Sequence, residues 1–248
     1  MASASIEAQY LSQLVKDTVK ALGLKKNGTM LGLGEGQWEF AKLCYKEIGE
    51  DAKSLLVAGK DSEVLKLAEE SGVPMTSNAD IKDLDGLANL GKYDGVICKG
   101  VLEEVANELN TLDDFLFAIY KTIRLKGKAV LVSRLRPTLP LPQSVLDAWA
   151  ESVPDSAALV KEAEECGFTP THIHLAYSAS VDTTVWKAHL LNGGGTVPIP
   201  FISAASKEEI EEFASSQGGK IGFKDEIDIV VLHKIISRVP KDDTAPKA

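Results

Sequence analysis

The stretch that decides the fold runs from Gly91 to Leu135 and reads GKYDGVICKGVLEEVANELNTLDDFLFAIYKTIRLKGKAVLVSRL. Within it, Asp94–Lys99 is a compact apolar run with β-branched residues, which is typical of a buried strand. Leu112–Ile123 has the apolar spacing of a helix, and Ala129–Arg134 is a second buried strand. A strand, a helix and a strand in this order predict neighbouring parallel strands joined by a helix.

The same alternation precedes this stretch. It begins with an amphipathic helix over Ile6–Leu22, ended near Gly23. The elements that follow are a strand at Thr29–Leu31, a helix at Trp38–Ile48, a strand at Ser54–Ala58, a helix at Glu63–Ser71 and a strand at Val73–Thr76. Buried strands that alternate with helices predict a parallel sheet covered on both faces.

The C-terminal half has a different organisation. Helical patterns occupy Gln143–Ser152 and Asp155–Cys166, and His172–Tyr177 and Thr183–Leu191 alternate as an antiparallel pair would. Beyond the Gly193–Gly195 break we expect a helix that opens at Ser206 with Glu209 three residues on, and a strand at Ile227–Leu232. We therefore expect a domain over residues 1–192, a C-terminal extension docked on it over 193–238, and a disordered tail over 239–248.

Composition narrows the function classes. Of the 248 residues, 27 are Lys or Arg and 36 are Asp or Glu, so the formal net charge of -9 argues against a nucleic-acid partner. The three cysteines Cys44, Cys98 and Cys166 lie far apart, which favours reduced thiols over a disulfide framework or a zinc site. The sequence has no apolar run of about 18 residues and no targeting pattern at its start, so we expect no membrane span and a cytoplasmic location.

A glycine-rich turn lies between the first strand and the helix at Trp38–Ile48. Its sequence, Gly32–Gly36 (GLGEG), allows the backbone to approach a ligand, and the following helix N-terminus offers free N–H groups. The dinucleotide-binding pattern G-x-G-x-x-G does not fit, because its third glycine would fall at Gln37 or at Glu39. The turn alone is compatible with several kinds of cofactor enzyme and with a purely structural role.

Later segments make the interpretation more specific. The pair Tyr93-Asp94, the segment Val101–Val105, the helix Phe115–Ile123 and the sequence Cys166-Gly167-Phe168 follow the glycine turn in order. In this order and spacing the chain resembles class I S-adenosylmethionine-dependent methyltransferases over roughly Thr29 to Leu191. The resemblance implies an α/β fold with a seven-stranded, mostly parallel sheet, helices on both faces and S-adenosylmethionine as cofactor.

The resemblance also implies roles for individual residues. Gly32, Gly34 and Gly36 would pass under the methionine and ribose part of the cofactor, and Cys98 and Lys99 would lie beside the sulfonium and the methyl acceptor. Asp61 would accept hydrogen bonds from the ribose, and Asp80, followed by Ile81, would take the adenine amino group. Each role has a structural alternative: a tight turn for the glycines, a helix N-cap for Asp61, and an N-cap or turn former for Asp80.

Four positions depart from the family pattern. Met30 stands where the family has an acid, and Gly59 occupies the usual place of the ribose-binding acid if Asp61 is displaced. Arg124–Gly127 replaces the turn that contains a proline and two glycines, and Glu104 replaces a histidine. A lost hydrogen bond to a ligand removes about 0.5–1.5 kcal/mol, so two lost acids would weaken micromolar cofactor binding toward the millimolar range.

Two functional hypotheses remain open. The first is an S-adenosylmethionine-dependent methyltransferase that acts on a small molecule or a lipid precursor. Its candidate bases are His172, His174, His189, His233, Tyr177, Glu103 and Glu104. The second is a methyltransferase-like domain that has lost the cofactor and serves as a scaffold or partner subunit. The apolar segment Ile199–Ser206 is expected to dock on the domain or on another subunit, so a protein partner or a homo-oligomer also remains open.

Overall fold

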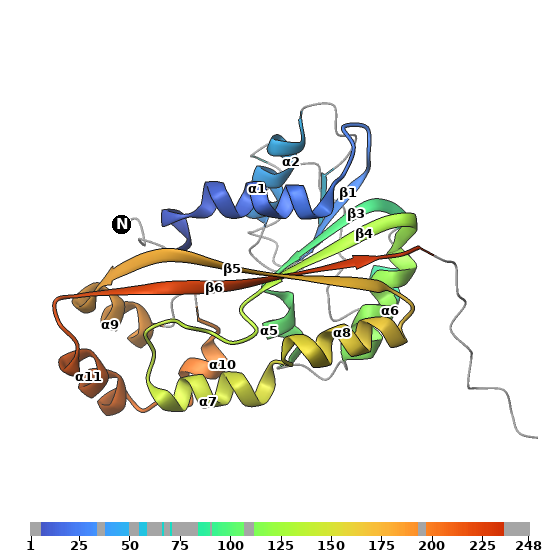
Figure 1. The fold of residues 1–248 in the computed structure, drawn as a ribbon. Coiled ribbons are helices and arrows are strands. Elements are labelled where there is room, and N and C mark those ends of the chain that lie inside the picture. The colour runs from blue at the N-terminus through green and yellow to red at the C-terminus, as the bar shows by residue number, and fades with distance from the viewer. Residues whose placement is uncertain are drawn as a thin grey trace, which may run out of the picture.

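A six-stranded mixed sheet organises the part of the chain that the structure describes (Figure 1). The structure is a computed structural model, and it describes residues 6–33, 38–49, 55–58, 66, 70, 84–89, 91–106, 112–192 and 197–235. The strands, in chain order, are β1 (Met30–Leu33), β2 (Leu55–Ala58), β3 (Tyr93–Lys99), β4 (Ile123–Ser133), β5 (Thr169–Asp182) and β6 (Lys220–His233). Their order in the sheet is β2-β1-β3-β4-β6-β5.

The strand pairings divide the sheet into two parts. The pairs β1–β2, β1–β3 and β3–β4 are parallel, whereas β6 lies between β4 and β5 and is antiparallel to both. The four parallel strands are the ones predicted near Thr29, Ser54, Asp94 and Ala129. The strand predicted at Val73–Thr76, which would be the seventh, lies outside the described residues.

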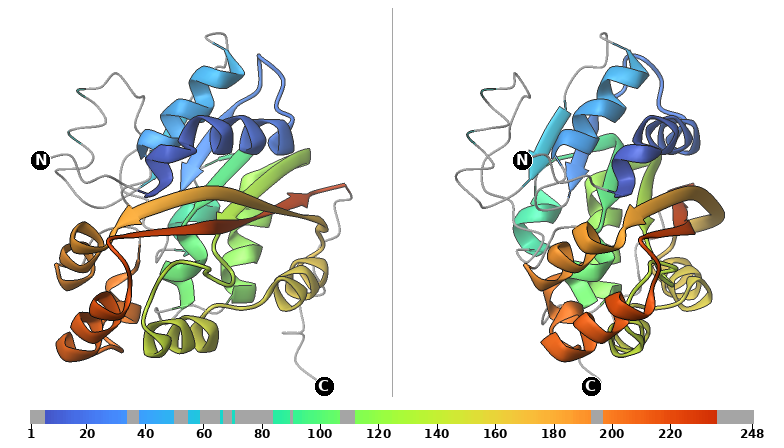
Figure 2. Two further views of the ribbon diagram at one scale, coloured as in Figure 1. Left: turned by 60° about the vertical axis from the view of Figure 1, so that its left-hand side comes forward. Right: turned by 90° about the vertical axis from the view of Figure 1, so that its left-hand side faces the viewer.

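Helices cover both faces of this sheet (Figures 1 and 2). The short 3-10 helix η1 (Ile6–Gln9) precedes α1 (Leu11–Leu22), which packs with α2 (Trp38–Ile48) on one face. The other face carries α4 (Leu84–Asn89), α5 (Val101–Ala106), α6 (Leu112–Thr122) and α8 (Ser156–Glu165). At the carboxyl end of β5 lie α9 (Thr183–Leu191) and α11 (Lys207–Ser216), and α7 (Gln143–Ser152) and α10 (Ile199–Ile202) lie below the sheet in Figure 1, between these helices and α8.

The core lies where α1 and α6 pack against the central strands. Val96 of β3 and Val130 of β4 are fully buried, as are Leu14 of α1 and Leu116 of α6. Full burial of one such side chain contributes about 1.5–3 kcal/mol, so these contacts hold the helices on the sheet. Gly23 ends α1 in the left-handed conformation, with φ 60°, and its N–H donates to the Val19 carbonyl, as the sequence predicted for a glycine at this place.

The prediction of a strand at Thr183–Leu191 is wrong, because this segment is helix α9. The Asp182 carboxylate caps the helix by accepting hydrogen bonds from the N–H groups of Thr184 and Val185. The strand that pairs with β5 is β6, and the two match along all 14 residues, from Thr169 opposite His233 to Asp182 opposite Lys220. The helix predicted to open at Ser206 is confirmed, since the Ser206 hydroxyl accepts from the N–H of Glu209.

The segment after residue 192 supplies β6 to the interior of the sheet and packs its helices against α7. Phe201 of α10 is buried against Trp149 of α7, with 4.8 Å between the ring centroids, whereas Ile199 stays 64% exposed. The segment Ile199–Ser206 is thus partly docked on the domain, and the predicted tail over 239–248 lies outside the described residues. No helix in the described part of the chain is both long and apolar enough to span a membrane.

Candidate functional site

The strand order reverses at β1, between its neighbours β2 and β3. From β1 the chain continues to β2 on one side, and it later returns as β3 on the other side of β1. Such a reversal of strand order leaves a crevice outside the carboxyl ends of the two strands, where α/β proteins bind ligands. Here Leu33 of β1 lies opposite Cys98 of β3. Gly32 and Leu33, predicted to lie in the glycine turn, belong to β1, and the rest of that segment, Gly34–Gly36, follows in the sequence.

The structure describes three of the predicted cofactor residues, Gly32, Cys98 and Lys99. Gly32 is buried in β1, between Val57 of β2 and Ile97 of β3. Cys98 and Lys99 end β3 at the same edge of the sheet, so the structure brings these three predicted residues together. The other predicted positions, Gly34, Gly36, Asp61, Asp80 and Ile81, lie outside the described residues, as does Gly59.

Met30 occupies the position where the family pattern has an acid. Its side chain is fully buried in β1, and its neighbours in the sheet are Leu55 and Gly95. A thioether in the core offers no strong hydrogen-bond acceptor to a ligand. Any contact with the charged end of a cofactor must therefore come from other groups at this edge.

The end of β3 carries a thiol, an ammonium and a glycine in succession. Cys98 is buried, and burial raises the pKa of its thiol, so it remains protonated. The Lys99 ammonium lies 2.8 Å from a carboxylate oxygen of Glu7 and 5.4 Å from the centroid of the Phe40 ring. Gly100 adopts φ 67°, which glycine reaches without a steric penalty, and its N–H donates to the Val132 carbonyl as the chain turns into α5.

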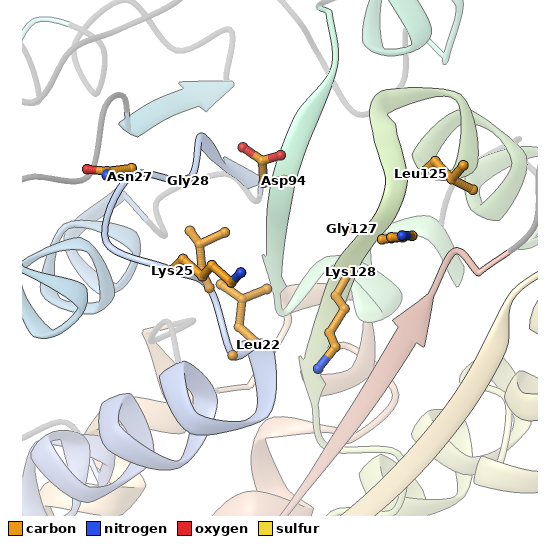
Figure 3. Close-up of a pocket in the computed structure, with 11 residues that line it drawn as sticks. Leu22, Lys25, Asn27, Gly28, Asp94, Leu125, Gly127 and Lys128 are labelled. Atoms are coloured by element: carbon orange, nitrogen blue, oxygen red, sulfur yellow. The ribbon is translucent and has the colours of Figure 1, made fainter.

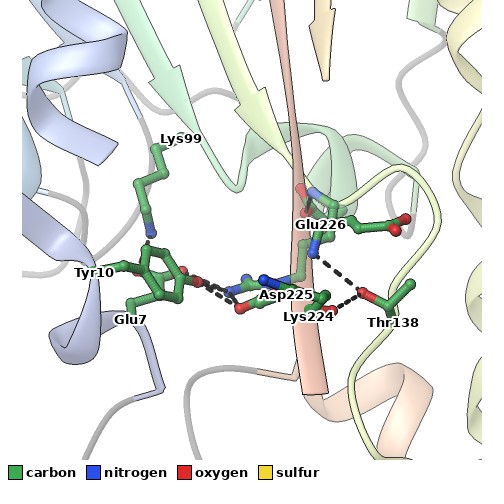
Figure 4. A network of polar contacts seen from close by, with 9 residues as sticks. Glu7, Tyr10, Lys99, Thr138, Lys224, Asp225 and Glu226 are labelled. Carbon is green, nitrogen blue, oxygen red and sulfur yellow. Dashed lines mark hydrogen bonds and ion pairs between the residues drawn. The ribbon is translucent and has the colours of Figure 1, made fainter. Parts of the chain in front are cut away.

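A buried ionic network lies beside Lys99 and joins three distant parts of the chain (Figure 4). Arg134, directly after β4, donates from Nε and Nη2 to the two carboxylate oxygens of Asp225, at 2.9 and 2.8 Å. The same Nη2 lies 3.1 Å from Glu7 and 3.0 Å from the Tyr10 hydroxyl, and Tyr10 donates to Asp225. Glu7 thus bridges Lys99 and Arg134, and the N-terminal segment is fixed over the ends of β3 and β4.

The charges of this network hold one another in their ionised forms. Burial alone would raise the pKa of Glu7, but the charges of Lys99 and Arg134 keep this pKa below its ordinary value. Burial alone would lower the pKa of Arg134, whereas its hydrogen bonds with Asp225 and the charge of Glu7 keep that pKa well above normal. Burial raises the pKa of Tyr10, so its phenol stays a donor at neutral pH.

Aromatic side chains hold both the N-terminal segment and Arg134 in place. The rings of Tyr10 and Tyr177 stack with 4.5 Å between centroids, and the Tyr177 hydroxyl donates to Asp17 of α1 at 2.8 Å. Trp149 Nε1 donates to the Arg134 carbonyl at 2.9 Å. Tyr177, a candidate base on sequence grounds, is therefore engaged in holding α1 on β5.

Sequence reasoning did not single out Glu7, Tyr10, Arg134 or Asp225. One signal was present in the sequence, since Arg134 ends the apolar run Ala129–Ser133, and a charge at the end of a buried strand needs a partner. The identity of that partner was not readable, because Asp225 lies 91 residues further along the chain.

The remaining candidate bases lie in β5, α5, α9 and β6. His172 and His174 share one side of β5, as predicted, and both contact one oxygen of Asp228, at 2.6 and 3.2 Å. Glu103 of α5 is buried next to the network, accepts from the Arg134 N–H, and has its pKa raised by burial. Among the described residues, no group of three or more His, Cys, Asp or Glu side chains is placed to hold a metal ion.

Comparison with solved structures bears on the fold. A Bacillus halodurans protein whose methyltransferase activity is inferred superposes with a TM-score of 0.60 at 14% identity, over 90% of this chain and 99% of its own. An Archaeoglobus fulgidus S-adenosylmethionine-dependent methyltransferase gives 0.51 at 17% identity, over 90% and 93%. Geranyl diphosphate methyltransferase in complex with S-adenosylmethionine gives 0.52 at 13% identity, over 89% and 84%.

The chain has the class I methyltransferase fold. This confirms the resemblance seen in the sequence. The superposed part extends beyond Thr29 to Leu191, because about nine-tenths of the chain takes part in each match. No family model and no curated protein matches the sequence. The fold assignment therefore rests on the superposition with these solved structures.

Proposed function

We propose that this protein is a methyltransferase that uses S-adenosylmethionine to methylate a small molecule or a lipid precursor. The observation that carries the proposal is the reversal of strand order at the carboxyl ends of β1 and β3, where the sequence continues from Leu33 into the rest of the glycine-rich segment. Backbone N–H groups at a glycine turn and at the following helix N-terminus are suited to hold a polar cofactor. Gly32, Gly34, Gly36, Asp61, Asp80 and Ile81 would hold it, with Cys98 and Lys99 beside its reactive end.

The electrostatics at the end of β3 fit a cationic sulfonium. An isolated ammonium at Lys99 would repel a second positive charge, but Glu7 forms an ion pair with Lys99 at 2.8 Å. Asp225 balances Arg134 in the same way at 2.8 Å. The edge of the crevice therefore carries paired charges, and a positive ligand can approach it without a net opposing charge.

S-adenosylmethionine would supply an electrophilic methyl group, and transfer of that group requires alignment and exclusion of water more than acid–base chemistry. Glu7 and Tyr10 hold the N-terminal segment over the ends of β3 and β4 through their contacts with Lys99 and Arg134. This cover keeps water from one side of the crevice. If the acceptor carries a proton, Glu103 is the buried carboxyl beside this edge. Burial raises its pKa, which makes its carboxylate a stronger proton acceptor when ionised.

The net charge and one structural neighbour support a small molecule or a lipid precursor as the methyl acceptor. The net charge of -9 disfavours a nucleic-acid acceptor. The neighbour named geranyl diphosphate methyltransferase has an isoprenoid diphosphate, a lipid precursor, in its name. On these grounds we infer a small or lipid-derived acceptor for this chain as well.

Calorimetric titration with S-adenosylmethionine and S-adenosylhomocysteine tests the proposal. We expect micromolar binding of at least one of them, lost in Gly34→Arg because the arginine side chain would fill the turn. Gly222→Arg is the matched control: a side chain at Gly222 of β6 meets no atom within 4 Å, so the same charge is added away from the crevice. Absence of both heat and a thermal shift at millimolar ligand would refute cofactor binding and support the scaffold hypothesis.

A further inference from the structure

A second cavity lies at the opposite edge of the sheet from the crevice, at the amino ends of β1, β3 and β4. Its volume is about 360 Å³, a size suited to a small organic ligand. One wall is the end of α1 and the loop before β1, with Leu22 and Lys25, and the other is the start of β4, with Leu125 and Lys128 (Figure 3). We call this cavity the amino-edge pocket.

A looped-out segment of β4 forms the second wall. Tyr93 of β3 pairs with Ile123 and Gly95 pairs with Lys128, so residues 124–127 of β4 stand opposite Asp94 alone. Lys126 within this bulge has φ 67°, a conformation that is costly for a residue with a Cβ. Gly127 anchors the bulge, since a Cβ there would meet Ile123 at 2.6 Å and the Asp94 carbonyl at 2.9 Å.

The bulge is the same Arg124–Gly127 segment in which the sequence departs from the family turn. Bulges commonly redirect a side chain at a functional site. In this protein the bulge brings Leu125 and Lys126 to the wall of the pocket. The departure therefore has a structural consequence that the proposed methyl transfer does not use.

The charges of the pocket are unbalanced. Asp94, its acidic residue, is already engaged by Arg124 at 2.9 Å and by Thr29 at 2.8 Å. Lys25 and Lys126 have no ion pair with any described residue, although the whole chain carries a net charge of -9. Lys128 lies against the carboxyl end of α1, where a Cβ on Gly23 would be 3.4 Å from its ammonium, and the helix dipole stabilises it there.

Apolar side chains complete the lining. Leu22 and Leu24 line the pocket from the α1 side, and Leu125, which is 52% exposed, lines it from the bulge. An apolar wall beside two unbalanced ammonium groups suits an amphipathic anion. Two lysines match the two charges of a phosphate monoester, and lysine binds phosphate as a point charge.

We propose that the amino-edge pocket binds a phosphate monoester with a short apolar group, through Lys25 and Lys126 for the phosphate and Leu125 for the apolar part. A soluble phosphate ester and the headgroup of phosphatidic acid both present a phosphate monoester next to an apolar group. The site is separate from the crevice at the carboxyl edge, and the proposal does not depend on methyl transfer.

The test is a nuclear magnetic resonance titration of the full chain with butyl phosphate and with inorganic phosphate. We expect saturable shifts of the Gly23, Gly28 and Gly127 amides with butyl phosphate, and about tenfold weaker binding in the Lys25→Gln/Lys126→Gln double variant. The matched control, Lys207→Gln/Lys220→Gln, removes the same charge from exposed positions elsewhere and should bind like wild type. Leu125→Ala should weaken binding of butyl phosphate and leave that of inorganic phosphate unchanged, because the removed side-chain atoms would contact only the apolar part of the ligand. The side chain is 52% exposed, so its truncation should leave the fold intact.

A second arm distinguishes the two sources of the phosphate. Sedimentation with phosphatidylcholine vesicles that contain phosphatidic acid, lost in the Lys25→Gln/Lys126→Gln variant, would identify a lipid headgroup. Binding of butyl phosphate without such sedimentation would identify a soluble ester. Equal weakening in the control variant, equal binding of the two phosphates, or no shift at the three glycine amides at millimolar butyl phosphate would overturn the proposal.

Discussion

Asp225→Asn is the substitution that tests the buried network most directly. Asp225 is fully buried and accepts two hydrogen bonds from Arg134 and one from Tyr10. An asparagine keeps the shape of the side chain but presents an NH2 donor to groups that are themselves donors, and it removes the charge that balances Arg134. The Arg134 guanidinium then has Glu7, at 3.1 Å, as its remaining carboxylate partner in this network.

The expected loss of stability follows from this geometry. Breaking a buried ion pair by removing one partner costs about 3–5 kcal/mol. Because Glu7 still neutralises part of the charge on Arg134, we expect the lower end, about 3 kcal/mol. For a chain of this length such a loss lowers the melting temperature by about 6–12 °C.

Urea unfolding followed by circular dichroism measures the effect, with an unchanged m-value showing that the transition is the same. The matched control is Asp147→Asn on the exposed side of α7, where the carboxylate accepts only from Gln143, and this change should stay within about 0.5 kcal/mol of wild type. In a double-mutant cycle, Arg134→Met with Asp225→Asn should cost at least about 1 kcal/mol less than the sum of the single changes. A loss below about 1 kcal/mol for Asp225→Asn, the range of an exposed pair, would refute the reasoning.

Two further predictions concern protonation and access. The pKa of Glu7 is below its ordinary value of 4.5 in the folded state, so the stability that Glu7 contributes is present above pH 4.5 and is lost as the pH falls through the folded pKa. The difference in unfolding free energy between wild type and Glu7→Gln should therefore shrink below pH 4.5. The pKa of Glu103 shifts in the opposite direction, but both proteins keep Glu103, so its contribution cancels in the difference. A difference that stays constant below pH 4.5 would contradict the ion pair. Burial raises the pKa of Cys44 to about 12 and that of the half-buried Cys166 to about 11. Iodoacetamide at about pH 8 should therefore modify Cys166 first, and the buried Cys44 and Cys98 only on unfolding. Mass spectrometry of a labelling time course checks this order, and native-state labelling of Cys98 as fast as that of Cys166 would show that the end of β3 is open.

The local pattern of the sequence was sufficient for most elements of the fold. The strand near Asp94 and the helices at Leu112 and Gln143 appear within one residue of their predicted limits. The strand predicted at Ala129–Arg134 ends within one residue of its predicted limit but starts six residues earlier, at Ile123. Burial imposes a period of 2 or 3.6 on the side chains of each element, and that period is visible in a single sequence. The glycine that ends α1 and the serine that caps α11 were readable for the same reason, since capping is a local interaction.

The segment Thr183–Leu191 shows where the pattern fails. Its alternation of apolar and polar residues fits a strand, but helix α9 forms because Asp182 caps its N-terminus and because β6 is the strand that pairs with β5. The partner β6 begins 38 residues after Asp182, at Lys220, so nothing local in the sequence indicates it. In the candidate site, Gly32, Cys98 and Lys99 could be placed at one edge from strand order alone, since parallel strands bring their carboxyl ends together.

The sequence by itself determined the alternation of strands and helices, the family that the chain resembles and the edge of the sheet where a cofactor would bind. The tertiary structure alone decided which charges meet. Glu7, Lys99, Arg134 and Asp225 are spread over more than 200 residues, and only the packing of η1, β3, β4 and β6 brings them within hydrogen-bonding distance. The amino-edge pocket has the same origin, because Lys25 and Lys126 become neighbours of one cavity only when the bulge in β4 faces the loop before β1. Periodicity follows from interactions within an element and is local, whereas the pairing of buried charges depends on contacts between elements that the chain order does not reveal.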